Sequence, residues 1–202
     1  MFNNQQALEK LMKLLRSVRP KFDLPMRLEY FFKEHMDEYD PVPNEDLVVR
    51  GRIPLFAYYI ISGYVYVTYK NKEGQLRVKY FYAADSIVAF ICFLDRLPSH
   101  YHIYAGHHTK LAVISRASVG LLFEEWEHMR SFAYTVLIED DRFRGEIYDD
   151  LMELDPVPRV VEFYRLNPCL LPAVEARLDK WIARFLKLKL RYLVKIRQGL
   201  GQ

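Results

Sequence analysis

The residues whose types point most clearly to a chemical function are basic residues near the C-terminal end of the sequence. Seven cations lie within residues 179–198: Lys180, Arg184, Lys187, Lys189, Arg191, Lys195 and Arg197. Lysine and arginine side chains form charge-assisted hydrogen bonds to phosphate oxygens, and arginine does so with a two-pronged geometry. This density of cations therefore favours the binding of a polyanion.

The apolar residues between these cations predict the elements that position them. Ile182 and Leu186 are four residues apart and Leu193 and Ile196 are three apart, so each pair lines one face of a helix. The pattern breaks phase around Leu188, which indicates two helices that meet through a short turn. Such a unit is typical of a helix-turn-helix, whose second helix enters the major groove of DNA. An ordinary amphipathic hairpin with a solvated basic face is the alternative interpretation.

The distribution of charge along the chain points the same way. The net charge is only +3, but from residue 156 onward ten Lys and Arg face three Asp and Glu. Residues 126–155 hold three basic and nine acidic residues. This asymmetry predicts a basic terminal module that meets a polyanion, attached to a body that does not. The length of 202 residues suits one or two domains.

The remainder of the chain changes periodicity twice. Apolar residues at helical spacing predict helices over residues 5–19 and 26–35. Residues 47–115 are rich in β-branched and aromatic residues. We expect short strands there at 58–61, 64–69, 76–82, 87–93, 100–105 and 110–114. Many short strands with regular turns imply a sandwich or barrel, and after residue 115 the helical period returns.

Both regions resemble one known family. The spacing from Ile182 to Ile196, with the small Ala183, resembles the helix-turn-helix of cyclic-AMP-receptor-type (Crp/Fnr) transcription regulators. Residues 47–115 are similar to the cyclic-nucleotide-binding β-roll of the same family. The matching landmarks are residues 59–65, the turn at Asp85, Pro98-Ser99, Ala105 and residues 111–115. One position departs, because Lys187 stands where the family has a turn glycine.

The resemblance implies the overall organisation. The fold class is expected to be α+β, with N-terminal helices, an antiparallel β-roll of the double-stranded jelly-roll type, a long dimerisation helix and a C-terminal helix-turn-helix. The expected domains are a sensor at 1–125, the long helix at 126–155 and a DNA-binding domain at 156–202. The apolar residues of the long helix that would pair two copies are Phe132, Val136, Phe143, Ile147 and Leu151. The alternative is that this stripe packs on the β-roll of its own chain.

The resemblance also implies partners, namely double-stranded DNA, a second copy of the chain and, further, RNA polymerase. Lys189, Arg191 and Tyr192 would open the recognition helix, with Lys195 one turn later. Arg191 takes the place of a glutamate that reads cytosine, and Lys195 that of an arginine that contacts guanine or phosphate. Operator preference is therefore expected to differ from the family's usual site. The contacts expected mainly with phosphates come from Lys180, Arg184 and Lys187.

The sensor region lacks the residues that hold cyclic AMP in the family. The Gly-Glu pair that takes the ribose falls on Val88-Ala89, and the arginine that pairs with the phosphate falls on Ser99, beside His100. A buried phosphate without a cationic partner is costly. Thr109, Lys110 and Arg96 are not expected to replace the arginine. We therefore predict that cyclic AMP is not bound in the usual way and that any small-molecule effector is of another kind.

Other chemistries find little support in the sequence. His100, His102, His107 and His108 form a cluster, and His100 and His102 are expected on one face of a strand, but a cupin-type metal site would also need a glycine and a glutamate that are absent. No metal, cofactor or enzymatic activity is predicted, since phosphate-loop, serine-hydrolase and zinc-protease motifs are missing. Two cysteines and the lack of a long apolar run predict a cytoplasmic protein without membrane association. A ligand- or protein-binding β-roll with a vestigial helix-turn-helix stays open as the second hypothesis, and a metal-binding cupin-like protein that would use the histidines as the third.

Overall fold

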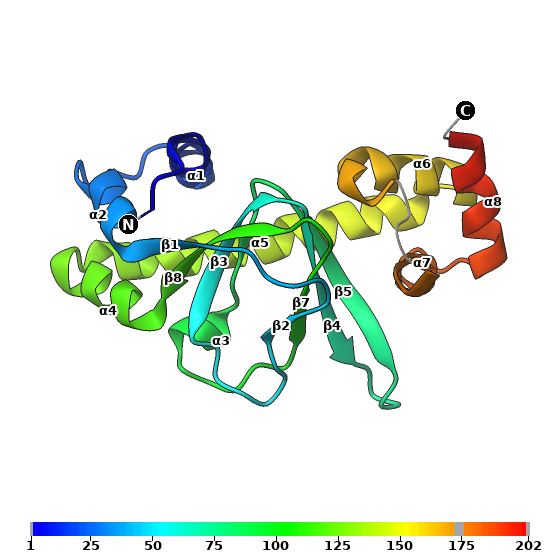
Figure 1. The fold of residues 1–202 in the computed structure, drawn as a ribbon, viewed down its shortest axis with the longest axis horizontal. Coiled ribbons are helices and arrows are strands. Elements are labelled where there is room, and N and C mark those ends of the chain that lie inside the picture. Colours follow the sequence, from blue (N-terminus) through cyan, green and yellow to red (C-terminus); the bar gives the residue numbers. More distant parts are fainter. Residues whose placement is uncertain (1, 172–175, 201–202) are drawn as a thin grey trace.

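The computed structural model of the chain describes residues 2–171 and 176–200. Its strands form two antiparallel sheets of four, in the orders β1-β8-β3-β6 and β2-β7-β4-β5 (Figure 1). The strands are β1 (Met36–Tyr39), β2 (Asp46–Val48), β3 (Phe56–Ser62), β4 (Tyr64–Lys70), β5 (Leu76–Ala83), β6 (Ile87–Val88), β7 (His102–Ala105) and β8 (Lys110–Ser115). The helices are α1 (Gln5–Val18), α2 (Leu28–His35), α3 (Ile91–Leu94), α4 (Arg116–Glu125), α5 (His128–Glu153), α6 (Pro156–Leu166), the 3₁₀ helix η1 (Pro168–Leu170), α7 (Ala176–Phe185) and α8 (Leu190–Leu200). The predicted α+β class with an antiparallel β-roll is confirmed.

The two sheets enclose an apolar core of their own. Inward-facing residues alternate along the strands, as the period of two requires. This cluster contains Val48, Tyr58, Ile60, Val65, Val67, Tyr80, Tyr82, Val88, Ile103 and Leu111. The β4–β5 hairpin runs from Tyr64↔Ala83 to Lys70↔Leu76, and the side chain of Asn71 accepts the backbone N–H groups of Glu73 and Gln75 to close its turn.

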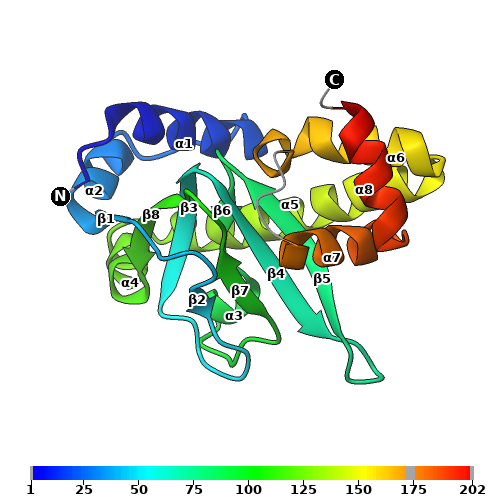
Figure 2. The ribbon, with the colours of Figure 1, turned by 45° about the vertical axis from the view of Figure 1, so that its right-hand side comes forward.

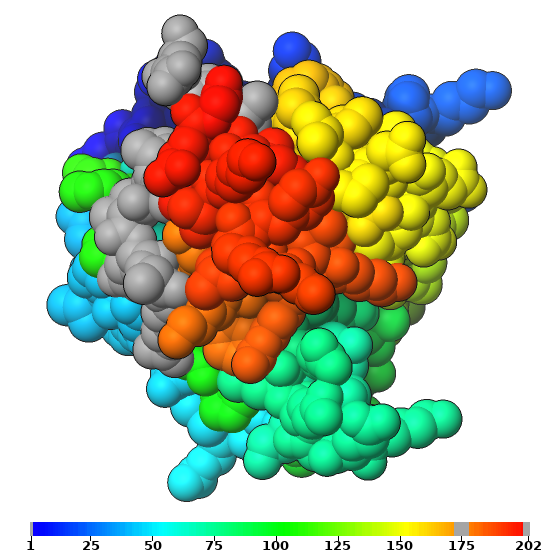
Figure 3. Space-filling model, turned by 90° about the vertical axis from the view of Figure 1, so that its right-hand side faces the viewer, coloured from blue at the N-terminus to red at the C-terminus, as the bar shows by residue number. Residues whose placement is uncertain are grey.

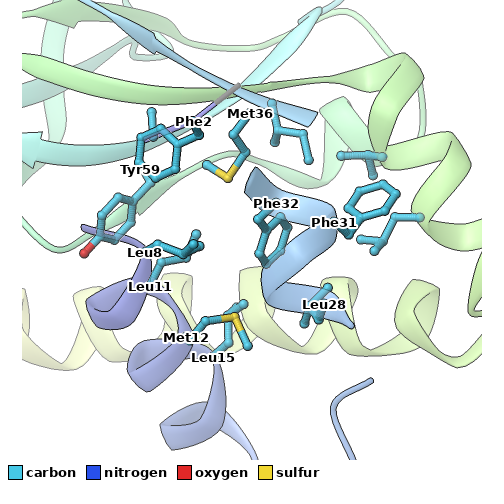
Figure 4. Packing of buried hydrophobic residues seen from close by; sticks show 14 of the residues in the cluster. Phe2, Leu8, Leu11, Met12, Leu15, Leu28, Phe31, Phe32, Met36 and Tyr59 are labelled. Atoms are coloured by element: carbon cyan, nitrogen blue, oxygen red, sulfur yellow. The ribbon is translucent and has the colours of Figure 1, made fainter. Parts of the chain in front are cut away.

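A second core joins the N-terminal helices to the β-roll and to the first half of α5. α1 contributes Leu8, Leu11, Met12 and Leu15, which all repeat on one helical face (Figure 4). These side chains meet Phe31 and Phe32 of α2 and also Phe132 of α5. α1 and α2 therefore lie over the start of α5 and cover it (Figure 1).

A third core connects the β-roll to the C-terminal helices. The ring of Phe81 in β5 lies 5.5 Å from that of Phe163 in α6 and 5.3 Å from that of Phe185 in α7. In both ribbon views α5 runs from the N-terminal helices along the β-roll to this end of the molecule (Figures 1 and 2). The three aromatic rings fix α7 against β5, so the C-terminal helices have a defined place on the body.

Two sequence expectations about local structure need correction. A strand was expected over residues 87–93, but β6 ends at Val88 and the short helix α3 follows it. β1 and β2 were not predicted, because Met36–Tyr39 carries two carboxylates and has only one buried residue. None of the helices within the described ranges has the length and apolarity needed to span a bilayer.

Candidate nucleic-acid interface

The C-terminal segment forms a bent pair of helices. α7 ends at Phe185 and α8 begins at Leu190, so the predicted break in helical phase corresponds to a real turn. The N–H of Leu188 donates to the carbonyl of Ala183 at 2.8 Å, and the N–H of Lys187 donates to that of Arg184 at 3.3 Å. This pair of hydrogen bonds is the Schellman pattern, which ends a helix on a residue in the left-handed conformation.

Lys187 is that left-handed residue, with φ of +56°. A residue with a Cβ adopts this conformation at a cost of about 1 kcal/mol, which is why glycine is favoured in such turns. Lys187 therefore forms the turn between α7 and α8, although the family has a glycine at this position. Its ammonium lies 5.7 Å from the ring centroid of Tyr148 in α5, a weak cation–π contact that offsets part of the strain.

A small apolar seam holds the two helices together. Ile182 and Ala183 of α7 and Leu186, which follows the helix, are buried, and they share one cluster with the buried Leu193 of α8. Leu188 and Ile196 are partly buried against the same cluster. The small side chain of Ala183 sits within this seam, where two helices approach closely. The predicted apolar positions are thus the ones that face inward.

The opposite face of the helix pair is basic and exposed. Figure 3 views this end of the molecule and shows α8 in front. The predicted interface residues that are exposed are Lys180, Arg184, Lys187, Lys189, Arg191, Tyr192 and Lys195. Among the described residues no acidic partner is found for Lys189, Arg191 or Lys195. Lys189 and Arg191 lie at the start of α8, where the helix dipole is positive, and Lys195 follows one turn later. Together these cations make a favourable environment for phosphate.

Gln198 belongs to the same exposed surface, although sequence reasoning did not select it. Arg191, Lys195 and Gln198 are separated by four and three residues, and all three are exposed. They therefore form one stripe along α8. An exposed glutamine on a helix of this kind has the amide geometry that pairs with an adenine edge. The signal in the sequence was the helical spacing alone.

Arg197 differs from the other predicted interface residues. Its guanidinium forms a two-pronged ion pair with Asp179 of α7, and both side chains are largely buried, at 15% and 10% exposed. The pair holds α8 to α7 and is surrounded by the apolar seam. Because its donors are directed at Asp179, Arg197 has a structural part in this arrangement.

Arg159 of α6 ties the helix pair to the end of α5. Its Nη2 donates to the carbonyl of Leu154 at 2.7 Å, and its Nη1 donates to the carbonyl of Leu186 at 2.9 Å. A further contact joins Nη2 to the carbonyl of Met152 at 3.3 Å. The guanidinium thus satisfies carbonyls at two helix ends, which would otherwise lack partners. It fixes the turn that contains Lys187 relative to α5.

The residues predicted for an effector pocket separate into two groups. Val88 and Ser99 are buried, and the Ser99 hydroxyl accepts the N–H of Tyr101 and donates to its carbonyl. Ala89 and His100 line a cavity of about 370 Å³ between the β-roll and α5. Its polar and aromatic lining includes Lys79, Tyr82, Phe90, Asp95, Tyr101, Asp140 and Asp141. Three carboxylates border this cavity, and Lys79, the cation of its lining, is already paired with Asp141, so a phosphate finds no free cation among the described lining residues.

Lys79 is the cation that sequence reasoning missed in this region. Thr109, Lys110 and Arg96 were considered, but none of them lines the cavity. Lys79 lies in the middle of β5 between Val78 and Tyr80. A lysine within a strand of aromatic residues is an unusual feature that the sequence shows. The face of the sheet on which its side chain lies, however, depends on how the strands pair.

The histidine cluster does not assemble. His100 precedes β7 and lines the cavity, whereas His102 begins β7, with its Nδ1 3.4 Å from Asp46 Oδ1. The expectation that both lie on one strand face is therefore wrong, because the strand starts after His100. His108 occupies a turn, with φ of +54°. Within the ranges described, no three His, Cys, Asp or Glu side chains are placed to hold a metal.

The apolar stripe of α5 is divided between the interior and the surface. Phe132, Val136 and Leu151 are buried within their own chain. Phe143 is 58% exposed and Ile147 is partly buried. Phe143 and Ile147 border a groove of about 760 Å³ between α5 and α6. Its apolar lining also includes Leu151, Leu154, Val157, Pro158, Val161 and Leu166.

Comparison with solved structures identifies the fold. No family model and no curated protein sequence matches the chain. FixK2 from Bradyrhizobium japonicum aligns with a TM-score of 0.61 and 13% identity over 82% of this chain and 84% of that one. The c-di-GMP-responsive global regulator CLP of Xanthomonas campestris gives 0.56 and 16% over 86% and 90%. A cyclic nucleotide-binding domain from Methylobacillus flagellatus gives 0.60 and 19% over 72% and 82%. The chain thus has a Crp/Fnr-like fold.

Proposed function

We propose that this protein is a DNA-binding transcription regulator of the Crp/Fnr type. The observation that carries the proposal is the exposed basic face of α8, held out by the bend at Lys187. The body of the protein does not cover this face, since α7 and not α8 packs on β5. CLP, which has a similar fold, is a global regulator that links cell-cell signalling to virulence gene expression, and this agrees with the proposed role.

The exposed residues of the interface make two kinds of contact with DNA, to base edges and to phosphates. Arg191, Tyr192 and Lys195 project from α8 and contact base edges in the major groove, with Lys189 at the helix start. The phosphate contacts come from Lys180, Arg184 and Lys187, which fix register without reading sequence. Arg197 acts by holding α8 on α7 through Asp179.

The protein acts as a homodimer in this proposal. Two recognition helices must lie about 34 Å apart to read successive turns of one DNA face. The groove between α5 and α6 is the surface we assign to the second copy, because Phe143, Val157 and Val161 are exposed there. Phe132, Val136 and Leu151 are covered by their own chain, so the contact rests on the second half of α5 and on α6. The residue ranges 1–125, 126–155 and 156–202 serve as sensor, dimer helix and DNA-binding part.

Selection of bound sites from a pool of random duplexes tests the proposal. The expected result is enrichment of a sequence with two-fold symmetry, whose half-sites are about 10 base pairs apart. In the same assay, cyclic AMP should leave the affinity unchanged, because the cavity has three carboxylates at its border and no free cation in the arginine position. If successive rounds of selection recover random sequences with no gain in affinity, the protein is not a DNA-binding regulator, and a ligand-binding β-roll is favoured.

A further inference from the structure

Lys79 lies in a site built for an ammonium group. Its Nζ is 2.7 Å from Oδ1 of Asp141 and 3.1 Å from the hydroxyl oxygen of Tyr101. The same atom lies 4.8 Å from the ring centroids of Tyr80 and Tyr101 and 5.8 Å from that of Phe90. Three aromatic faces and one carboxylate therefore surround a single cation. We call these four groups, from Tyr80, Phe90, Tyr101 and Asp141, the ammonium cage.

The cage joins separate parts of the fold. Lys79 and Tyr80 belong to β5, Phe90 immediately precedes α3, Tyr101 immediately precedes β7, and Asp141 is on α5. The hydroxyl of Tyr80 also donates to Asp141, with 3.1 Å to Oδ1. A contact through Asp141 connects the β-roll directly to the long helix.

The environment keeps the Lys79 side chain charged. Burial lowers its pKa, but the hydrogen bonds with Asp141 and Tyr101 more than offset burial, and the pKa is raised from its ordinary value. The side chain is 24% exposed. A cation that is this well covered is stable only with a partner charge, and aromatic faces add cation–π attraction.

The ammonium cage lies between two cavities. Lys79 and Tyr101 border both the cavity of about 370 Å³ and a neighbouring one of about 300 Å³. The first cavity contains Ala89 and His100, from the region in which the sequence predicted an effector. The ammonium of the chain itself therefore sits between the two spaces that a small molecule would fill.

We propose that the ammonium cage is a binding site for an alkylammonium group, and that Lys79 is its built-in occupant. In the folded chain this occupant fastens β5 to α5 without any added effector. If the chain binds DNA as proposed above, the fastening keeps α5 and the helices that follow it in the binding arrangement. That last consequence rests on the proposed function, while the cage does not.

Chemical rescue tests the cage in the full chain. Lys79→Ala removes three methylene groups and the ammonium, which n-propylammonium restores. We expect Lys79→Ala to lower Tm by about 4 °C, and 50 mM n-propylammonium chloride to recover at least half of that shift. Sodium chloride and n-propanol at equal concentration serve as controls for ionic strength and for the alkyl chain. Lys72→Ala, at an exposed lysine in the β4–β5 turn, should leave Tm unchanged.

Lys79→Met supplies the matched variant. Methionine fills the cage with a side chain of similar length but no charge, so Tm should fall and n-propylammonium should not recover it. The inference is overturned if Lys79→Ala is as stable as the original chain, or if n-propylammonium raises its Tm no more than it raises that of the original chain. If Lys79→Ala does not fold, Asp141→Asn decides, and a Tm equal to that of the original chain overturns the inference.

DNA affinity measured on the same samples separates this inference from the proposed function. Loss of affinity in Lys79→Ala and its recovery with n-propylammonium support both. Recovery of Tm in a chain that never binds duplex DNA supports the cage and rejects the regulator.

Discussion

The guanidinium of Arg197 in α8 reaches back across the helix pair to the carboxylate of Asp179 in α7, with Nη2 3.0 Å from Oδ2. Both side chains are largely buried, and Arg197 also interacts with the side chain of Tyr164 in α6. Two partners that are 18 residues apart thereby set the angle between the helices. Arg197 holds the opposite side of α8 against α7, so the face of α8 that carries Arg191 and Lys195 is exposed.

Breaking this ion pair should destabilise the fold, and the two single changes should not add. We expect Asp179→Asn and Arg197→Met each to lower the free energy of unfolding by about 3 kcal/mol, since each leaves a covered group without its partner. The double variant should lose clearly less than the sum, because no charge is then left unpaired. Urea unfolding of the four proteins measures the cycle, and strict additivity would argue against the pairing.

Replacing the left-handed lysine by glycine should stabilise the turn. Lys187→Gly removes backbone strain of about 1 kcal/mol and gives up a cation–π contact of about 0.5 kcal/mol at an exposed site. The net expectation is a small gain in the free energy of unfolding, with weaker DNA binding because one phosphate contact is lost. Lys180→Gly, at an exposed lysine inside α7, serves as the control for the gain in backbone freedom, and it should lower stability. A loss of stability in Lys187→Gly would mean that the Schellman turn is described wrongly.

Removal of the Arg159 guanidinium should loosen the helix pair. Arg159→Met leaves the carbonyls of Leu154 and Leu186 without their donor, at a cost of about 2 kcal/mol. Hydrogen exchange should speed up at the turn between α7 and α8 more than in the β-roll. Arg165→Met is the control on the same helix, since Arg165 is exposed and its ion pair within the described residues is with the neighbouring Glu162 rather than with a helix end. Equal exchange in both variants would show that Arg159 has no special part.

A charge in the groove between α5 and α6 should separate two copies of the chain. Phe143→Asp places a carboxylate where the proposed dimer contact is apolar, so sedimentation equilibrium should show weaker dimerisation by at least tenfold. Met26→Asp changes an apolar residue that is more exposed than Phe143, at 98% against 58%, and lies outside the groove, so it should have no effect. If Phe143→Asp dimerises as the original chain does, the second copy does not use this groove.

The helix pair could be predicted from the sequence because its information is local. The phase change at Leu188 and the spacing of Ile182 and Leu186 are properties of neighbouring residues, and they fix a bend and an inward face. Lys187 illustrates the same point, because only its own backbone had to adopt the left-handed conformation. The strands of the β-roll were likewise predicted from local residue types.

What could not be predicted depends on partners that are distant in sequence. Arg197 looked like the other cations until Asp179 was found beside it, and Lys79 gained its role from Asp141, 62 residues away. The periodicity of α5 showed an apolar stripe, but not that α1 and α2 would cover Phe132. A pattern says which face is apolar, and only the packing says what lies on it.

The dependence of affinity on salt decides whether the start of α8 binds duplex DNA. The triple variant Lys189→Gln, Arg191→Gln, Lys195→Gln is compared with Lys13→Gln, Lys21→Gln, Lys110→Gln, which removes the same charge from exposed sites elsewhere. For the original chain and for the second variant we expect a steep slope of log affinity against log salt, on the order of −5. The α8 variant should lose at least about 100-fold in affinity and show a shallower slope. Equal affinity and equal slope for the two triple variants would show that Lys189, Arg191 and Lys195 do not bind DNA.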